Sequence, residues 1–316
     1  MDEIRVPIYF ITGFLESGKT SFLKFTLEQD YFCIEGRTLL ILCEEGEVEY
    51  DPSVLEVSDT VVEIIEKEED LTPERLQAMD ILHNPERVII EYNGMWLASK
   101  FEQMQLPQGW GIAQHITIVD ASTYSVYMNN MKSQFMDMVR NAEMIVFNRC
   151  KEGDPLASYR RGIKVANQKA EIIFEDDEGE IEDIFGDGMP FDLEADVIEI
   201  LPEDYGIWFV DTMDHPERYV DKTVKFKGRV LKPKAMQAKC FVPGRTAMTC
   251  CADDTTFLGY ICKSGYAPKL QEGQWVEVTA RIKVEQQAAY RGKGIVLYAE
   301  HVQPCDPLPE EMVYFN

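Results

Sequence analysis

Eight consecutive residues, from Gly13 to Thr20, fit the phosphate-loop pattern GxxxxGK[ST]. Glycines in such a loop let successive backbone N–H groups turn toward a phosphate, and the start of the following helix adds partial positive charge. A lysine at this spacing reaches the outer phosphates, and the final hydroxyl binds Mg²⁺. The pattern therefore predicts a magnesium-dependent nucleotide site with Lys19 and Thr20 as catalytic residues. The loop residues expected to bind the nucleotide are Gly13, Glu16, Ser17, Gly18, Lys19, Thr20 and Ser21.

A second chemical signal is the acid that ends the apolar run 87–91, followed three residues later by Gly94. In phosphate-loop enzymes a carboxylate at this point holds the magnesium ion through water, and the glycine N–H senses the γ-phosphate. We therefore assign Glu91 to the metal and to catalysis, and Gly94 to the nucleotide. The alternative is a core strand that merely ends in glycine. After the apolar run 37–43, Glu44 or Glu47 either faces the magnesium ion or lies in a solvated loop.

A third signal concerns the base, because Asn148 to Lys151 stand where a guanine-specific NKxD motif would be. Asn148 is in place, and the stem of Arg149 can cover a base. Lys151 replaces the aspartate that would accept hydrogen bonds from guanine N1 and N2, although Glu152 or Asp154 could substitute if the loop shifts. A site without that acceptor loses much of its discrimination, so GTP is the preferred nucleotide while its selectivity over ATP stays open.

Alternating strands and helices must position these residues. The segment that follows the phosphate loop, up to Leu27, has the apolar spacing of a helix that faces a sheet. We therefore predict an α/β domain of the P-loop NTPase type, a mostly parallel sheet with helices on both faces. The apolar runs expected to form its buried strands are 6–12, 37–43, 87–91, 115–120 and 144–148.

From Thr223 onward the pattern changes to short alternating strands punctuated by glycine and proline. Such a pattern is typical of a small all-β barrel, and an oligomer-binding (OB)-like barrel is the economical choice. We predict a nucleotide-binding domain at 1–174, an acidic linker at 175–200 and the β-rich OB-like domain at 201–316.

The formal net charge is −25, and residues 171–200 contain 13 acids and no base. An acidic surface repels phosphate backbones, so we expect no nucleic-acid partner. The acidic run itself is read as a solvated linker, with a site for a basic partner as the alternative. No apolar stretch approaches the roughly 20 residues of a membrane span, and the first residues do not resemble a signal peptide. We therefore expect a cytoplasmic protein that is not an integral membrane protein.

Eight cysteines in a chain without an export signal are expected to be free thiols or metal ligands. The densest group of soft ligands is Cys250 and Cys251 with Cys240, and thiolates suit Zn²⁺. Adjacent residues of a strand point to opposite faces, so this pair shares one ion only at a bulge or turn. A buried, metal-free pair is the alternative.

In their order along the chain, these motifs resemble the CobW/HypB/UreG family of P-loop GTPases. The resemblance covers residues 5–175 and implies slow GTP hydrolysis coupled to delivery of zinc, cobalt or nickel to a target protein. Family members usually carry a GCxCC metal motif after the second strand, whereas residues 52–86 contain no cysteine, so metal delivery is implied only weakly. The stretches that carry the resemblance are 13–20, 44–51, 90–94, 119–121 and 147–149.

The C-terminal half looks like the OB-like C-terminal domain of bacterial YcgQ-type proteins, which are paired with predicted permeases. The first interpretation is thus a GTPase with a metallochaperone or metal-homeostasis role, whose barrel senses or passes on a metal or a partner protein. The second is a nucleotide-regulated scaffold for a membrane permease, with negligible turnover, and the third is a kinase-like enzyme that uses ATP or another nucleotide. Homodimerisation stays open. The stretches similar to that domain are 241–245, 248–254 and 274–278.

Overall fold

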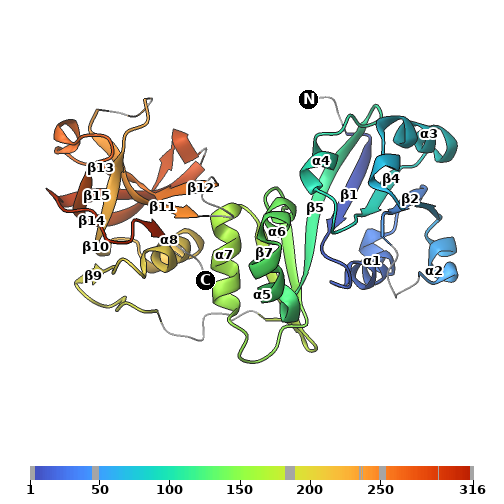
Figure 1. Cartoon of the computed structure of the whole chain (residues 1–316), viewed down its shortest axis with the longest axis horizontal. Helices are drawn as coiled ribbons and strands as arrows, with labels where there is room; N and C mark the ends of the chain where they lie inside the picture. Colours follow the sequence, from blue (N-terminus) through green and yellow to red (C-terminus); the bar gives the residue numbers. More distant parts are fainter. Residues whose placement is uncertain are drawn as a thin grey trace. The chain divides into compact units, whose positions relative to one another are not determined.

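The computed structural model describes residues 4–44, 50–181, 189–234, 236, 238–248, 254–290 and 292–313. The chain forms two compact units (Figure 1). The first comprises residues 1–156 and 166–184, and the second comprises 157–165 and 185–316. Most of helix α7 (Leu156–Ala166) therefore belongs to the second unit, although strands of the first unit precede and follow it in the sequence. Among the described residues, no helix combines the length and apolar character needed to span a membrane.

The first unit is built on a sheet with the strand order β3-β2-β4-β1-β5-β6-β7-β8. Every neighbouring pair is parallel except β7 and β8, so the predicted mostly parallel sheet is confirmed. The central strand β1 leads into the phosphate loop, and β4 and β5 lie on either side of it. The strands are β1 (Val6–Thr12), β2 (Thr38–Leu42), β3 (Thr60–Ile64), β4 (Arg87–Glu91), β5 (Trp110–Asp120), β6 (Met144–Asn148), β7 (Glu171–Asp176) and β8 (Gly179–Glu180).

Alternation along β1 divides the core of this unit into two layers. Ile11 packs in one cluster with Leu23 and Leu27 of α1, whereas the ring of Phe10 lies 4.8 Å from that of Phe101 in α4. Because neighbouring strand residues point to opposite faces, helices cover both faces of the sheet, as predicted. The helices are α1 (Lys19–Leu27), α2 (Pro52–Val57), α3 (Pro73–His83), α4 (Ala98–Glu102), α5 (Ala121–Asn130) and α6 (Lys132–Val139).

The second unit contains a closed barrel, which confirms the predicted small all-β barrel, and the barrel has five strands. Strand β10 pairs with both β14 and β11, and the ring closes through β13 and β15. Helix α8 (Tyr205–Asp214) contributes Trp208 to the core of this unit, with its ring 4.9 Å from that of Phe226. The strands are β9 (Val197–Glu199), β10 (Thr223–Leu231), β11 (Cys240–Met248), β12 (Thr255–Gly259), β13 (Ile261–Lys263), β14 (Trp275–Gln287), β15 (Gly292–Pro304) and β16 (Met312–Val313).

Short elements complete the chain. Residues 175–200, predicted as a linker, include the end of β7 and all of β8 and β9, and β9 pairs in parallel with β10. Within this segment, residues 182–188 lie outside the described part of the chain, and the three-segment division stays a prediction. The 3₁₀ helices are Asp30–Phe32, Glu68–Asp70, Pro216–Arg218, Ala267–Lys269 and Ala288–Tyr290.

Candidate nucleotide-binding site

The phosphate loop has a backbone that only glycine allows at its start. Gly13 has a φ of 144°, and a Cβ added there would lie 2.4 Å from the carbonyl oxygen of Ile118. A Cβ on Gly94 would lie 2.4 Å from the carbonyl oxygen of Gly13. Any side chain at either position would push the loop away from its neighbours. Gly94 thus lies against the phosphate loop, and its contact with a γ-phosphate stays a prediction.

The side chain of Lys19 folds back onto the phosphate loop. Its Nζ donates to the carbonyl oxygens of Gly13 (3.0 Å) and Phe14 (2.9 Å) and to Oε2 of Glu44 (2.6 Å). The two side chains of this ion pair are only 3% and 10% exposed. In this structure Glu44 is therefore the counter-ion of Lys19, and its predicted role as a magnesium ligand stays a prediction. The following residues, 45–49, lie outside the described part of the chain.

Thr20 and Glu91, the two residues predicted to serve the metal, meet directly. The Thr20 hydroxyl donates to Oε1 of Glu91, and the Tyr50 hydroxyl donates to Oε2, both at 2.6 Å. Glu91 is buried, and burial followed by the charge of Glu91 raises the pKa of Tyr50. A hydroxyl beside a carboxylate is a pair of hard oxygen donors that suits Mg²⁺. Sequence reasoning did not assign Tyr50 to the site, although the residue lies in the acidic stretch 44–51.

The end of β6 is tied to the phosphate loop by two side chains. Asn148 Nδ2 donates to the carbonyl oxygen of Ser17 at 2.7 Å. The Arg149 guanidinium donates to the carbonyl oxygen of Glu16 at 2.9 Å and to the carboxylate of Asp120. The structure therefore brings the predicted base residues, Asn148 and Arg149, onto the predicted loop. Asp120 was not among the predicted site residues, although it ends β5 and lies in the stretch 119–121 that carries the family resemblance.

Two buried polar atoms of this site have no hydrogen-bond partner within the described residues, namely Ser17 Oγ and Asn148 Oδ1. A buried hydroxyl or amide oxygen without a partner costs free energy that a bound polar ligand can recover. Ser21, the last predicted loop residue, lines a groove together with Gly18 and Asn148. The arrangement is thus suited to a polar ligand that extends from the loop toward the end of β6.

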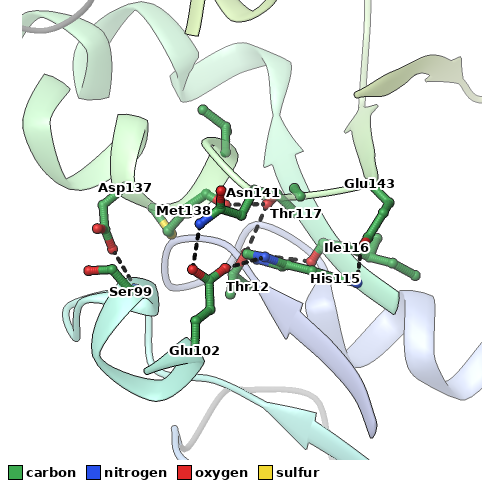
Figure 2. Close-up of polar contacts among 12 residues, drawn as sticks. Thr12, Ser99, Glu102, His115, Ile116, Thr117, Asp137, Met138, Asn141 and Glu143 are labelled. Atoms are coloured by element: carbon green, nitrogen blue, oxygen red, sulfur yellow. Dashed lines mark hydrogen bonds and ion pairs between the residues drawn. The ribbon is translucent and has the colours of Figure 1, made fainter. Parts of the chain in front are cut away.

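A partly buried polar network lies on the other face of the sheet, next to the end of β1 (Figure 2). Glu102 Oε1 lies 3.0 Å from Nδ1 of His115, whose Nε2 lies 3.1 Å from Oγ1 of Thr12. Asn141 donates to the second oxygen of Glu102 at 2.6 Å, and Thr12 contacts the Thr117 hydroxyl at 2.9 Å. Thr12 directly precedes Gly13, so this chain of contacts fixes the end of β1. No local sequence pattern marked His115 or Glu102.

Replacing Glu102 by glutamine is expected to remove an acid-sensitive part of the stability. Burial raises the pKa of Glu102, but hydrogen bonds from His115 and Asn141 outweigh it, and the pKa lies below its ordinary value of 4.5. A lowered folded pKa stabilises the fold above pH 4.5, and this contribution is lost as the pH falls through the folded pKa. Thermal unfolding of the wild type and Glu102→Gln should therefore differ at pH 7 and converge in acid. The exposed Glu74→Gln serves as control, and an equal difference at both pH values would contradict the prediction.

The predicted zinc ligands are only partly visible. Cys240 is a half-buried free thiol at the start of β11, and Cys250 and Cys251 lie outside the described residues. Within the described part of the chain, no group of three or more histidine, cysteine, aspartate or glutamate side chains is placed to hold a metal ion. The zinc site at these cysteines stays a prediction.

Comparison with known proteins gives two family matches. The family model described as CobW/HypB/UreG, nucleotide-binding domain, matches residues 7–174, and the one described as DUF1980 C-terminal domain matches residues 187–315. A search of curated proteins found no match.

Solved structures that resemble the chain include the hydrogenase maturation factor HypB from Archaeoglobus fulgidus, at 18% identity over 54% of this chain and 81% of that chain, with a TM-score of 0.37. The Zn(II)-bound YjiA GTPase from E. coli is 18% identical over 73% of this chain and 74% of that chain, with a TM-score of 0.42. A Zn(II)-bound triple mutant of YjiA is 16% identical over 82% and 89%, also with a TM-score of 0.42.

Proposed function

Because the chain belongs to the CobW/HypB/UreG nucleotide-binding family over residues 7–174, we propose that it binds and slowly hydrolyses a nucleoside triphosphate, GTP by preference. The observation that carries this proposal is the meeting of Thr20 with Glu91 beside a glycine-lined phosphate loop that contains Lys19. Family membership also supports a role in metal homeostasis, with the protein that receives the metal as a partner.

The donor set fits a magnesium ion, which Thr20 and Glu91 would hold. When bound, Mg²⁺ would neutralise charge on the phosphate oxygens. Residues of the chain itself would stabilise the rest of the charge. Lys19 must leave Glu44 to donate to the outer phosphates, and together with the loop N–H groups it stabilises charge that develops during phosphoryl transfer. Positioning and charge, rather than covalent chemistry, account for the rate.

A nucleotide-dependent switch is proposed for the segments 44–51 and 92–97. Tyr50 links the first segment to Glu91, while Gln134 Nε2 donates to the carbonyl oxygens of Gly94 (3.3 Å) and Trp96 (2.9 Å) in the second. A γ-phosphate that engages Lys19 and Gly94 would alter both sets of contacts. Known switch loops work in this way, because γ-phosphate contacts order them and hydrolysis releases them.

The second unit is proposed as the output of this switch. Its five barrel strands follow the order β10-β11-β13-β15-β14, and β13 and β15 pair in parallel. This closed five-stranded arrangement supports the OB-like interpretation, and OB folds are binding modules. We propose that this barrel receives a metal or docks a partner protein such as a permease.

Purified full-length chain is expected to release phosphate slowly from GTP with Mg²⁺ and to stop when a chelator removes the metal. The measurement is phosphate release together with equilibrium binding of GTP and ATP on one preparation. Slow, magnesium-dependent turnover supports the enzyme. Tight GTP binding without phosphate release would favour the nucleotide-regulated scaffold, and failure to bind any nucleoside triphosphate would contradict both.

A further inference from the structure

We propose that Glu175 supplies the base-recognising carboxylate that the incomplete NKxD pattern lacks, so that the site selects a base with two adjacent N–H donors, as guanine has. This inference rests on the proposed nucleotide function and assigns its base specificity. The residue lies on a different strand from the motif, which is why the local sequence around Lys151 does not reveal it.

The register of β6 and β7 places Glu175 beside Asn148. Phe147 pairs with Phe174, and the Cys150 N–H donates to the carbonyl oxygen of Glu175 at 3.0 Å. The Phe147 and Phe174 rings stack with centroids 4.9 Å apart. Because strand residues alternate, the next residue on each strand, Asn148 and Glu175, points to the opposite face. That face is the one covered by α1, since Val146 and Ile173 pack with the α1 cluster.

A groove of about 670 Å³ joins these residues to the phosphate loop. Its volume lies within the range of about 300–1,000 Å³ that is typical of small-molecule sites. The groove thus reaches Gly18 at the end of the phosphate loop, and it brings together an aromatic ring, an amide and a carboxylate that could contact a base. The residues that line its phosphate-loop end are Gly18, Ser21, Phe22, Asn148, Glu175 and Asp176.

Of the two described acids that line this groove, Glu175 and Asp176, only Glu175 has a carboxylate left available. Asp176 Oδ1 accepts from the N–H groups of Glu178 (2.8 Å) and Gly179 (3.1 Å), and Asp154 Oδ2 accepts from that of Lys151 (2.8 Å). In the described part of the chain, the Glu175 carboxylate has no hydrogen-bond or ion-pair partner, and burial followed by the charge of Glu180 raises its pKa. N–H donors on a ligand would relieve the cost of this partly buried, unpaired group.

The hydrogen-bond donors and acceptors on each base determine which base the Glu175 carboxylate would select. An ionised carboxylate offers two acceptors, which match the N1–H and N2–H donors of guanine in a bidentate, charge-assisted pair. Adenine presents one donor beside an acceptor on the same edge, and the acceptor would face a carboxylate oxygen. A carboxamide offers one acceptor and one donor, which match xanthine, whose N1–H lies beside a carbonyl oxygen.

Glu175→Gln is therefore expected to weaken GTP binding at least about 10-fold and to strengthen XTP binding by a similar factor. The experiment measures dissociation constants of full-length wild type and variant for GTP, ATP and XTP with Mg²⁺. The matched controls are Asp154→Asn and Glu152→Gln, which neutralise acids in the loop that follows Asn148. Both should leave the ratio of GTP affinity to XTP affinity unchanged. Because the expected result includes a gain of XTP affinity, misfolding cannot imitate it.

Three outcomes would overturn the assignment. An unchanged GTP/XTP ratio in Glu175→Gln, with wild-type GTP binding intact, would refute Glu175 as the acceptor while leaving the proposed function in place. A switch toward XTP in Asp154→Asn or Glu152→Gln instead would move the acceptor to the motif loop. If the wild type binds none of the three nucleotides, the proposed function fails first and this inference falls with it.

Discussion

Lys19→Ala is expected to lower magnesium-dependent phosphate release at least about 100-fold, the scale seen when one preorganised donor is removed from a transition-state charge. Lys19 is the residue whose type and spacing place a positive charge at the outer phosphates. In this structure its buried Nζ already lies against the loop, although it must leave Glu44 before it can donate to the phosphates. Phosphate release under saturating nucleotide is the measurement.

The same substitution leaves the Glu44 carboxylate without its counter-ion, and this alone could disturb the loop. The double variant Lys19→Ala with Glu44→Gln is the control, because it removes the charge of both partners. If the double variant also fails to turn over but unfolds like the wild type, the loss belongs to catalysis. Wild-type turnover in either variant would contradict the role of Lys19.

Glu44→Gln is expected to lower the stability of the nucleotide-free protein and to tighten nucleotide binding. Breaking a buried ion pair by neutralising one partner costs about 3 kcal/mol. The nucleotide-bound state, in which Lys19 contacts phosphates instead, does not carry that cost. Affinity should therefore rise by as much as about 100-fold. The measurements are the dissociation constant and the free energy of unfolding, each with and without nucleotide.

Asp59→Asn is the matched control for this variant, since Asp59 forms an exposed ion pair with Arg37 at 3.4 Å. Exposed pairs contribute little, so both measurements should stay near the wild type. Weaker nucleotide binding in Glu44→Gln, seen only with Mg²⁺, would instead identify Glu44 as a magnesium ligand. It would refute the proposal that Glu44 holds Lys19 away from the phosphates.

The parts that could be predicted from sequence are those whose chemistry is local. The phosphate loop requires a strand, glycines at fixed spacing and a helix within about 20 residues, so Gly13 and Lys19 stood out. Glu91 followed from the end of one apolar run. The mostly parallel sheet and the small all-β barrel likewise follow from the pattern of apolar runs, and both predictions are confirmed.

Contacts between distant segments could not be predicted in this way. Tyr50 and Glu91 are 41 residues apart, and Thr12 and His115 are 103 apart. A hydroxyl or imidazole in an otherwise ordinary strand or loop gives no sign of the partner that it will meet after folding. The pairing of Lys19 with Glu44 was missed for the same reason, although both residues had been named.

Because most of α7 belongs to the second unit, the two units cannot be separated cleanly by one cut in the chain. Val165 belongs to the core of that unit, and Asp214 pairs there with Arg160 (2.8 Å) and Lys164 (3.3 Å). The polypeptide therefore crosses the boundary three times, after residues 156, 165 and 184. A single cut after β7 would leave α7 joined to the first unit, so the second unit expressed alone would lose the contacts of Val165, Arg160 and Lys164.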